Sequence, residues 1–105
     1  MSKSGNQKSP IGERLREART RKGLSQKKLG ILAGIDQFSA SARINQYERD
    51  KHVPDFSTAR RLADKLEIPV TYLYAENDDL AELIRVYGEL GSRKRQQLLR
   101  LFVES

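Results

Sequence analysis

The sequence has no cysteine, one histidine, and no apolar run near the roughly 18 residues that a membrane-spanning helix needs. Without cysteine there can be no disulfide framework and no thiolate chemistry. The first ten residues, MSKSGNQKSP, are polar and lack the apolar core of a secretory signal. These absences predict a cytoplasmic protein that does not enter a membrane and needs no metal to fold.

Residue patterns that support catalysis are equally scarce. The single histidine, His52, stands in a basic segment close to a proline, and no acidic pair suggests a reaction centre. Gly-rich phosphate loops and metal-ligand spacings are also missing. The sequence therefore predicts a protein that is not an enzyme and uses no cofactor.

Positive charge is what the chain has in excess. It carries 20 lysines and arginines against 14 acidic residues, for a net charge of +6. Residues 1–24 hold seven of the basic residues and only two of the acidic ones. A basic excess gathered at one end of a small domain favours a polyanionic partner such as nucleic acid. Charge alone leaves open a lysine-rich surface that only contacts solvent.

The hydrophobic pattern is helical throughout, and 105 residues suffice for one small domain with added helices. After a disordered tail (1–8), helices are expected over 10–22, 26–33 and 39–50, then after Asp55 and from Pro69. Inward positions include Leu32 in the second helix, and Leu73 and Tyr74 in the fifth. The sequence predicts an all-α fold, with a five-helix domain over 9–76 and a helical pair over 77–105.

Three segments closely resemble the phage-repressor and Cro-like helix-turn-helix family, of the xenobiotic-response-element type. They read "IGERLREARTRKGLSQKKLG", "INQYERDKHVP" and "ARRLADKLEIPVTYL", and the resemblance spans about residues 11–75. In this arrangement one helix braces across the DNA backbone while the next enters the major groove. The resemblance implies that the helix over 39–50 reads DNA.

The outer face of that helix suits base edges. Alanine can contact a thymine methyl group, arginine can bind guanine through two hydrogen bonds, and glutamine or asparagine can do the same for adenine. The alternative is a capped surface helix whose polar face is only solvated. The expected base-reading residues are Ser41, Ala42, Arg43, Asn45 and Gln46.

Phosphate contacts are expected on either side of this helix. Lys27 and Lys28 occupy the first turn of a helix, where the helix dipole favours acidic side chains. Two lysines at this place are unfavourable unless an anion such as a phosphate binds there. The resemblance adds Gln26 as a backbone contact and Arg19–Glu48 as a structural ion pair. Ordinary exposed surface charges are the alternative in each case. The expected phosphate contacts are Gln26, Lys27, Lys28, Arg49, Lys51 and His52.

Three positions depart from the family pattern. About four additional residues separate Gly34 from Tyr47, which enlarges the turn, and we expect Phe38 to point inward and anchor it. Asp50 replaces the usual glycine, although aspartate tolerates the left-handed conformation that ends a helix. Gly30 replaces the usual alanine, which favours close helix packing.

The pair of helices over 77–105 has more apolar surface than a small domain needs. We expect it to form a homodimer, with folding back onto the core as the alternative. The predicted function is a repressor-type regulator that binds a palindromic site in double-stranded DNA. An antitoxin-like or adaptor module that binds a protein partner, as yet unknown, is the competing interpretation. The expected dimerisation residues are Leu83, Ile84, Tyr87, Leu98, Leu99 and Phe102.

Overall fold

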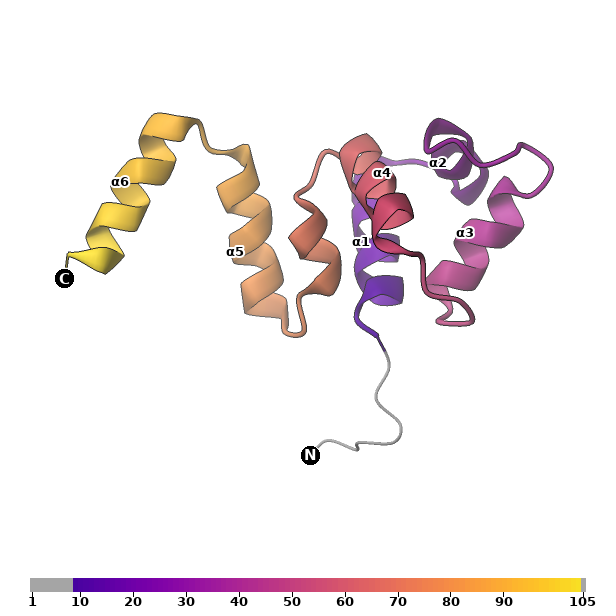
Figure 1. Cartoon of the computed structure of the whole chain (residues 1–105), viewed down its shortest axis with the longest axis horizontal. Helices are drawn as coiled ribbons and strands as arrows, with labels where there is room; N and C mark the ends of the chain where they lie inside the picture. Colours follow the sequence, from indigo (N-terminus) through magenta and orange to yellow (C-terminus); the bar gives the residue numbers. More distant parts are fainter. Residues whose placement is uncertain (1–8, 105) are drawn as a thin grey trace, which may run out of the picture.

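The computed structural model describes residues 9–104, and within this range the regular secondary structure is entirely helical (Figure 1). This confirms the all-α prediction. The tail expected over residues 1–8 lies outside the described residues. In chain order the elements are α1 (Ile11–Lys22), α2 (Gln26–Leu32), α3 (Ala40–Glu48), α4 (Phe56–Leu66), the 3₁₀ helix η2 (Val70–Tyr74), α5 (Asp78–Glu89) and α6 (Ser92–Val103).

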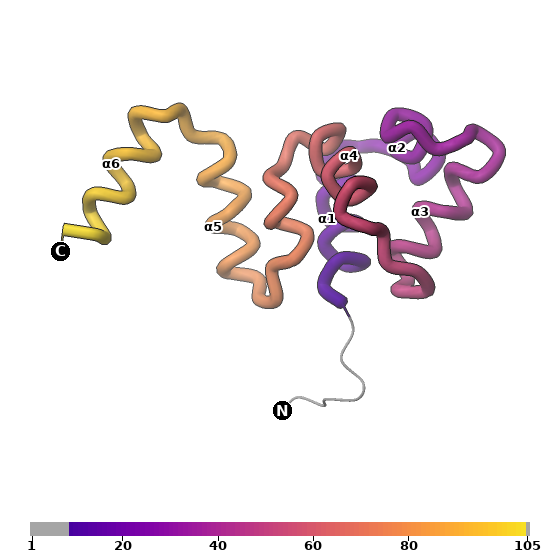
Figure 2. Tube along the Cα trace, viewed as in Figure 1, coloured from indigo at the N-terminus to yellow at the C-terminus, as the bar shows by residue number. Residues whose placement is uncertain are grey.

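The core lies among α1, α2, α3, α4 and η2, which are arranged around it as the backbone trace in Figure 2 shows. The apolar stripe of α4 faces inward along its whole length, because its members recur at the spacing of a helical turn. Each helix of the group contributes at least one fully buried side chain. The largest of these side chains are Leu15, Leu29, Ile44, Leu62, Tyr72 and Leu73.

Helices α2 and α3 approach each other closely at Gly30. A Cβ atom added to Gly30 would lie 2.7 Å from the Cβ of Ala40, which is itself fully buried. Any larger side chain at either position would push the two helices apart. The expectation of close packing at Gly30 therefore holds, but its partner Ala40 was not identified from the sequence.

Two predicted inward residues point outward instead. Leu32 is 39% exposed, because it flanks the Leu29–Ala33 face on which α2 packs. In η2 the buried aromatic residue is Tyr72 rather than Tyr74, since a 3₁₀ helix turns every three residues and presents a different set of side chains. Buried Tyr72 also donates a hydrogen bond from its hydroxyl to Glu17 Oε1 at 3.2 Å.

Capping residues determine where several of the helices begin and end. Ser25 Oγ accepts the backbone N–H of Lys28 at 3.0 Å, and Asp55 Oδ1 accepts that of Thr58 at 2.8 Å. The bond from the Thr58 amide lowers the pKa of Asp55. At the end of α3, Asp50 adopts the left-handed conformation with φ of 60°, as its place after the helix predicts.

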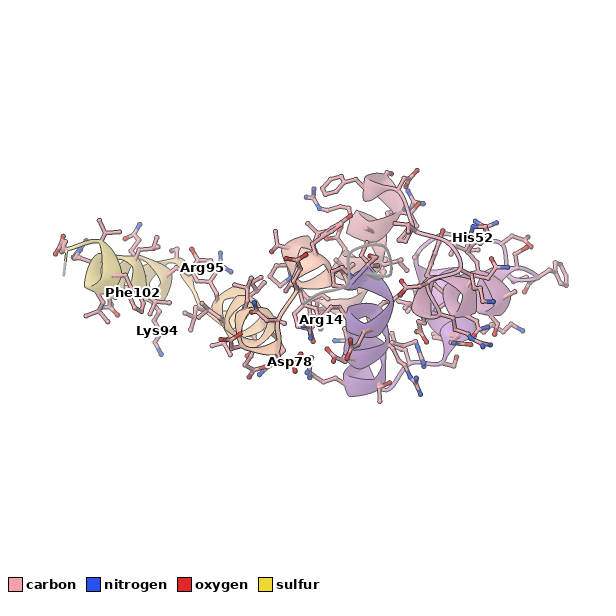
Figure 3. All side chains as sticks on the ribbon, turned by 90° about the horizontal axis from the view of Figure 1, so that it is seen from below. Arg14, His52, Asp78, Lys94, Arg95 and Phe102 are labelled. Atoms are coloured by element: carbon pink, nitrogen blue, oxygen red, sulfur yellow. The ribbon has the colours of Figure 1, made fainter. Side chains whose placement is uncertain are left out.

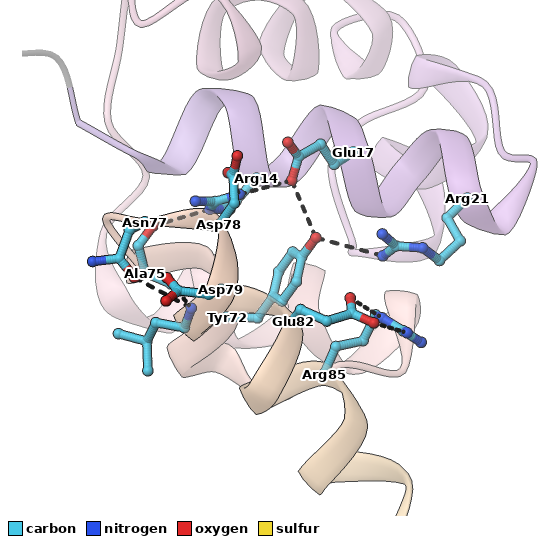
Figure 4. Close-up of polar contacts among 11 residues, drawn as sticks. Arg14, Glu17, Arg21, Tyr72, Ala75, Asn77, Asp78, Asp79, Glu82 and Arg85 are labelled. Carbon is cyan, nitrogen blue, oxygen red and sulfur yellow. Dashed lines mark hydrogen bonds and ion pairs between the residues drawn. The ribbon is translucent and has the colours of Figure 1, made fainter.

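The last two helices differ in how they join the rest of the molecule. Helix α5 packs on η2, with Ala81 buried and Pro69 in close contact with Gly88. Its N-terminus is tied to α1 by Arg14, which donates to Ala75 O at 2.9 Å and to Asp78 Oδ1 at 3.0 Å (Figure 4). Helix α6 has no buried residue and stands apart at one end of the molecule (Figure 1).

Candidate nucleic-acid interface

Helix α3 is fixed from its inner side and uncovered on its outer side. Ile44 and Tyr47 are buried against the core. The predicted base-reading residues divide into two groups: three are exposed and two are half-buried. The exposed ones are Ser41, Ala42 and Arg43, and the half-buried ones are Asn45 and Gln46.

An ion pair holds α3 against α1. Arg19 donates from Nε to Glu48 Oε2 at 2.6 Å and from Nη2 to Glu48 Oε1 at 3.1 Å. A third donor, Arg19 Nη1, bonds Leu24 O at 2.9 Å. The Glu48 side chain is only 4% exposed, so the two-pronged contact is largely shielded from water. Such a pair fixes the orientation of α3 even where its net stabilisation is small.

Gln26 connects the start of α2 to the same cluster. Its Nε2 donates to Glu48 Oε1 at 3.0 Å and to Asn45 Oδ1 at 3.3 Å. Sequence reasoning missed this contact, since nothing in the spacing of residues 26 and 45 announces it. Asn45, which lies on α3, is therefore bonded to Gln26, a residue predicted to contact the DNA backbone. Arg16 is a further basic residue at this place, and it borders a polar hollow of about 250 Å³ with Gln26 and Asn45.

The other predicted phosphate contacts lie on the surface at the two ends of this region. Lys27 and Lys28 are exposed in the first turn of α2. Arg49, Lys51 and His52 are exposed after α3. Figure 3 shows His52 on the side of the molecule opposite α6.

A second polar hollow, of about 440 Å³, opens between α3 and the start of α4. Arg43 and Gln46 from α3 and His52 from the following turn all border it. The structure thus brings two predicted base-reading residues and one predicted phosphate contact around the same depression. Asp55 lies there too, with its carboxylate engaged by the Thr58 amide.

The enlarged turn between α2 and α3 corrects one prediction. Phe38 does not point inward; it is 88% exposed. The turn is held instead by Asp36, whose Oδ2 accepts the Phe38 N–H at 3.0 Å and whose carbonyl accepts the Ser39 N–H at 2.9 Å. Ala40 takes the inward place against Gly30, which leaves no room there for a phenyl ring.

All six predicted dimerisation residues border a single groove. It has a volume of about 690 Å³ and runs between α5, α6 and the segment leading into η2. Arg95 crosses one part of it, donating to the carbonyls of Tyr87 and Gly88 at 3.1 Å each, with its guanidinium 4.9 Å from the Tyr87 ring centre. The six residues are Leu83, Ile84, Tyr87, Leu98, Leu99 and Phe102.

Residues 9–104 contain no group of three or more side chains of the kinds that hold a metal ion. In the same range no helix has both the length and the apolar character needed to cross a membrane.

Comparison with known proteins agrees with this geometry. A family model described as "Helix-turn-helix domain" matches residues 12–89. The crystal structure of transcriptional regulator BswR is similar to this chain, with 47% sequence identity and a TM-score of 0.85. The alignment covers 90% of this chain and 94% of that one. The curated proteins include no match. With the helix-turn-helix model covering most of its length, this chain belongs to the family of helix-turn-helix transcriptional regulators, which bind DNA.

Proposed function

We propose that the protein is a sequence-specific repressor that binds a palindromic operator as a homodimer, with α3 in the major groove. The observation that carries this proposal is the division of α3 into two faces. Its inner face is locked by Ile44, Tyr47 and the Glu48 ion pair, while Ser41, Ala42 and Arg43 are left uncovered. A rigid helix with an uncovered polar face is suited to reading base edges.

The chemistry of the exposed face supports direct readout. Arg43 offers a guanidinium that can bind the O6 and N7 atoms of guanine together. Gln46 can bind adenine in the same two-bonded manner, and both residues border one hollow. Ser41 and Ala42 are small, so the start of the helix can approach the bases closely.

The basic residues around α3 supply contacts that do not depend on sequence. Lys27 and Lys28 lie before it in the chain, and Arg49, Lys51 and His52 follow it. Neutralising phosphates releases counterions, so each such contact adds affinity for any DNA and makes binding more sensitive to salt. These contacts would orient the protein while α3 selects the sequence.

Two copies are needed because one short helix contacts too few base pairs to select a site among many. The α5–α6 groove and the exposed apolar side of α6 supply a surface for pairing. Leu99 is 51% exposed and Leu101 is 69% exposed in the single chain. An apolar surface of this kind favours a protein partner over DNA. A dimer bound at an operator excludes other proteins from that DNA, which is the simplest route to repression.

The same groove favours one competing function, in which it binds a different protein, as in an antitoxin or an adaptor. The two possibilities differ in the state of the isolated protein. Pairing of identical chains gives a mass near 24 kDa for the purified protein, twice the 12.0 kDa of one chain. Light scattering after size-exclusion chromatography measures this mass directly.

Selection of bound sites from a random pool of duplex DNA at near-physiological salt tests the proposal. We expect an inverted repeat whose half-sites lie about one helical turn, roughly 34 Å, apart. Recovery of a single half-site would contradict dimeric reading. A pool unchanged after selection would contradict sequence-specific binding and favour the protein-partner function.

A further inference from the structure

The turn between α2 and α3 displays an aromatic ring at the end of the molecule where α3 begins. Figure 1 shows this turn projecting beyond both helices, at the end opposite α6. Phe38 is 88% exposed, the largest exposure of any large apolar side chain among residues 9–104. A phenyl ring in water gains nothing from folding, so its place at this surface calls for another explanation.

The backbone that carries Phe38 is well fixed. Asp36 accepts the N–H groups of Phe38 and Ser39, and the carbonyl of Ser39 in turn accepts the Arg43 N–H at 2.8 Å. Helical winding therefore starts directly after Phe38. Ala40, two residues further on, is buried against Gly30. The ring and the first exposed turn of α3 thus form one continuous piece anchored to α2.

The position of the ring determines what it can meet on DNA. In helix-turn-helix proteins the N-terminal part of the second helix contacts base edges. Phe38 stands immediately before that part, three residues from Ser41 and four from Ala42. Because Phe38 adjoins that part in the chain and is exposed, we infer that its ring lies in the major groove or at its edge when α3 enters the groove.

The chemistry of the turn distinguishes bases from phosphates as its partner. Phe38 has no charge, and the nearby Asp36 carboxylate repels phosphate oxygens. The one apolar group that base pairs present in the major groove is the 5-methyl group of thymine. A phenyl ring that covers this methyl group removes apolar surface of both partners from water.

We propose that Phe38 contacts a thymine methyl group next to the bases read by α3, so that the enlarged turn adds a specificity-determining residue. This inference rests on the proposed sequence-specific binding of DNA. It assigns the turn a ligand group of its own, separate from the polar contacts of Arg43 and Gln46.

The test replaces thymine by deoxyuridine, which removes the methyl group and leaves base pairing intact. The probe is the duplex most enriched by the wild-type protein, with each thymine replaced in turn in one half-site. At one position we expect the dissociation constant to rise about fourfold, the value of one buried methyl group. The Phe38→Ala variant should bind the thymine and uracil duplexes at that position equally well.

Phe56→Ala is the matched control, because Phe56 is also an exposed phenylalanine (58%) but lies at the start of α4. It should keep the full preference for thymine over uracil. Site selection repeated with Phe38→Ala should lose the thymine preference at that one position per half-site and retain the others.

Three outcomes would overturn the inference. One is that the wild-type protein binds its enriched site with the same affinity whichever thymine is replaced by deoxyuridine. Another is a Phe38→Ala variant that keeps the wild-type ratio between thymine and uracil. A third is a loss of affinity in Phe38→Ala that is the same for all duplexes. In each case the wild-type protein still selects a sequence, so the proposed function stands; if no sequence is selected at all, that function fails first.

Discussion

Helices α3 and α6 each leave one face uncovered, but the two faces differ in chemistry and in support. The outer side of α3 is polar and small, with Ser41, Ala42 and Arg43 exposed. The exposed positions of α6 include Leu99, Leu101 and Val103. A polar face with an arginine suits the hydrogen-bonding edges of DNA, whereas an apolar face suits another protein surface.

The support behind the two helices differs as well. Helix α3 is anchored by buried Ile44 and Tyr47 and by the contact of Glu48 with Arg19. Helix α6 has no buried residue, and its Arg95 donates hydrogen bonds to the carbonyls of Tyr87 and Gly88 in the preceding helix. A rigid helix can place side chains accurately against bases, while a helix with little support gains its packing from a partner. We therefore propose that α3 recognises DNA and that α6 pairs with a second copy.

The largest expected effect concerns α6. Leu99→Asp places a charge on the apolar groove, and a charge buried in an apolar interface without a partner is costly. We expect the dissociation constant of the proposed dimer to rise roughly 1,000-fold, about 4 kcal/mol, and DNA binding to weaken accordingly. Analytical ultracentrifugation measures the first effect. Thermal unfolding of the single chain should change little, because Leu99 is already half exposed there.

Gln97→Asp serves as the control for that change, since Gln97 is an exposed residue of α6 outside the groove. It should leave the dimer intact. If Leu99→Asp remained as dimeric as Gln97→Asp, pairing through this groove would be excluded.

The next largest effect concerns the support of α3. Arg19→Ala leaves the Glu48 carboxylate, 4% exposed, without its two-pronged partner, and we expect a loss of about 3 kcal/mol in the free energy of unfolding. Urea denaturation measures it. Arg60→Ala is the control: Arg60 and Asp64 are both more than half exposed and 3.8 Å apart, so the loss should stay below about 1 kcal/mol. Equal losses would mean that the Arg19 pair does not anchor α3.

A smaller effect is expected for the basic residues that flank α3. Lys28→Ala should weaken binding to all duplexes alike and reduce the dependence of log K on log salt by about one unit. Fluorescence anisotropy over a range of salt concentrations measures this slope. Lys65→Ala, which removes an exposed lysine from α4, should leave the slope unchanged. A loss confined to the preferred duplex would contradict a phosphate role for Lys28.

The smallest effect concerns Asp55, which caps the start of α4. The bond from the Thr58 amide holds the pKa of Asp55 below its ordinary value of 3.8. A lowered carboxyl pKa means that the folded state favours the ionised form, so its contribution is present above pH 3.8 and disappears as the pH falls through the lower folded-state pKa. Asp55→Asn should therefore melt below the wild type at pH 6, with the difference shrinking below pH 3.8. A difference in melting temperature that stays constant with pH would exclude a contribution of Asp55 ionisation to stability.

Much of the fold follows from local patterns that the sequence displays openly. The helical hydrophobic pattern predicted where the first three helices lie and that α4 begins after Asp55. The inward position of Ala40 did not follow, because it depends on the space that Gly30 leaves on another helix. Phe38 was placed wrongly for the same reason: apolarity favours burial, but only the fold shows that the inner place is already filled.

The candidate site was also only partly visible in the sequence. Residue types and the family resemblance pointed to α3 and to its flanking basic residues. The bonds from Gln26 to Asn45 and Glu48 join residues about twenty positions apart, and only the crossing of α2 and α3 brings them together.

The most direct test of the central claim compares Arg43→Ala with Lys28→Ala on two probes, the selected operator and a duplex of scrambled sequence. We predict that Arg43→Ala costs about 1–3 kcal/mol on the operator and much less on the scrambled duplex, while Lys28→Ala weakens both to the same degree. Equal losses on both duplexes for both variants would contradict the assignment of sequence reading to α3.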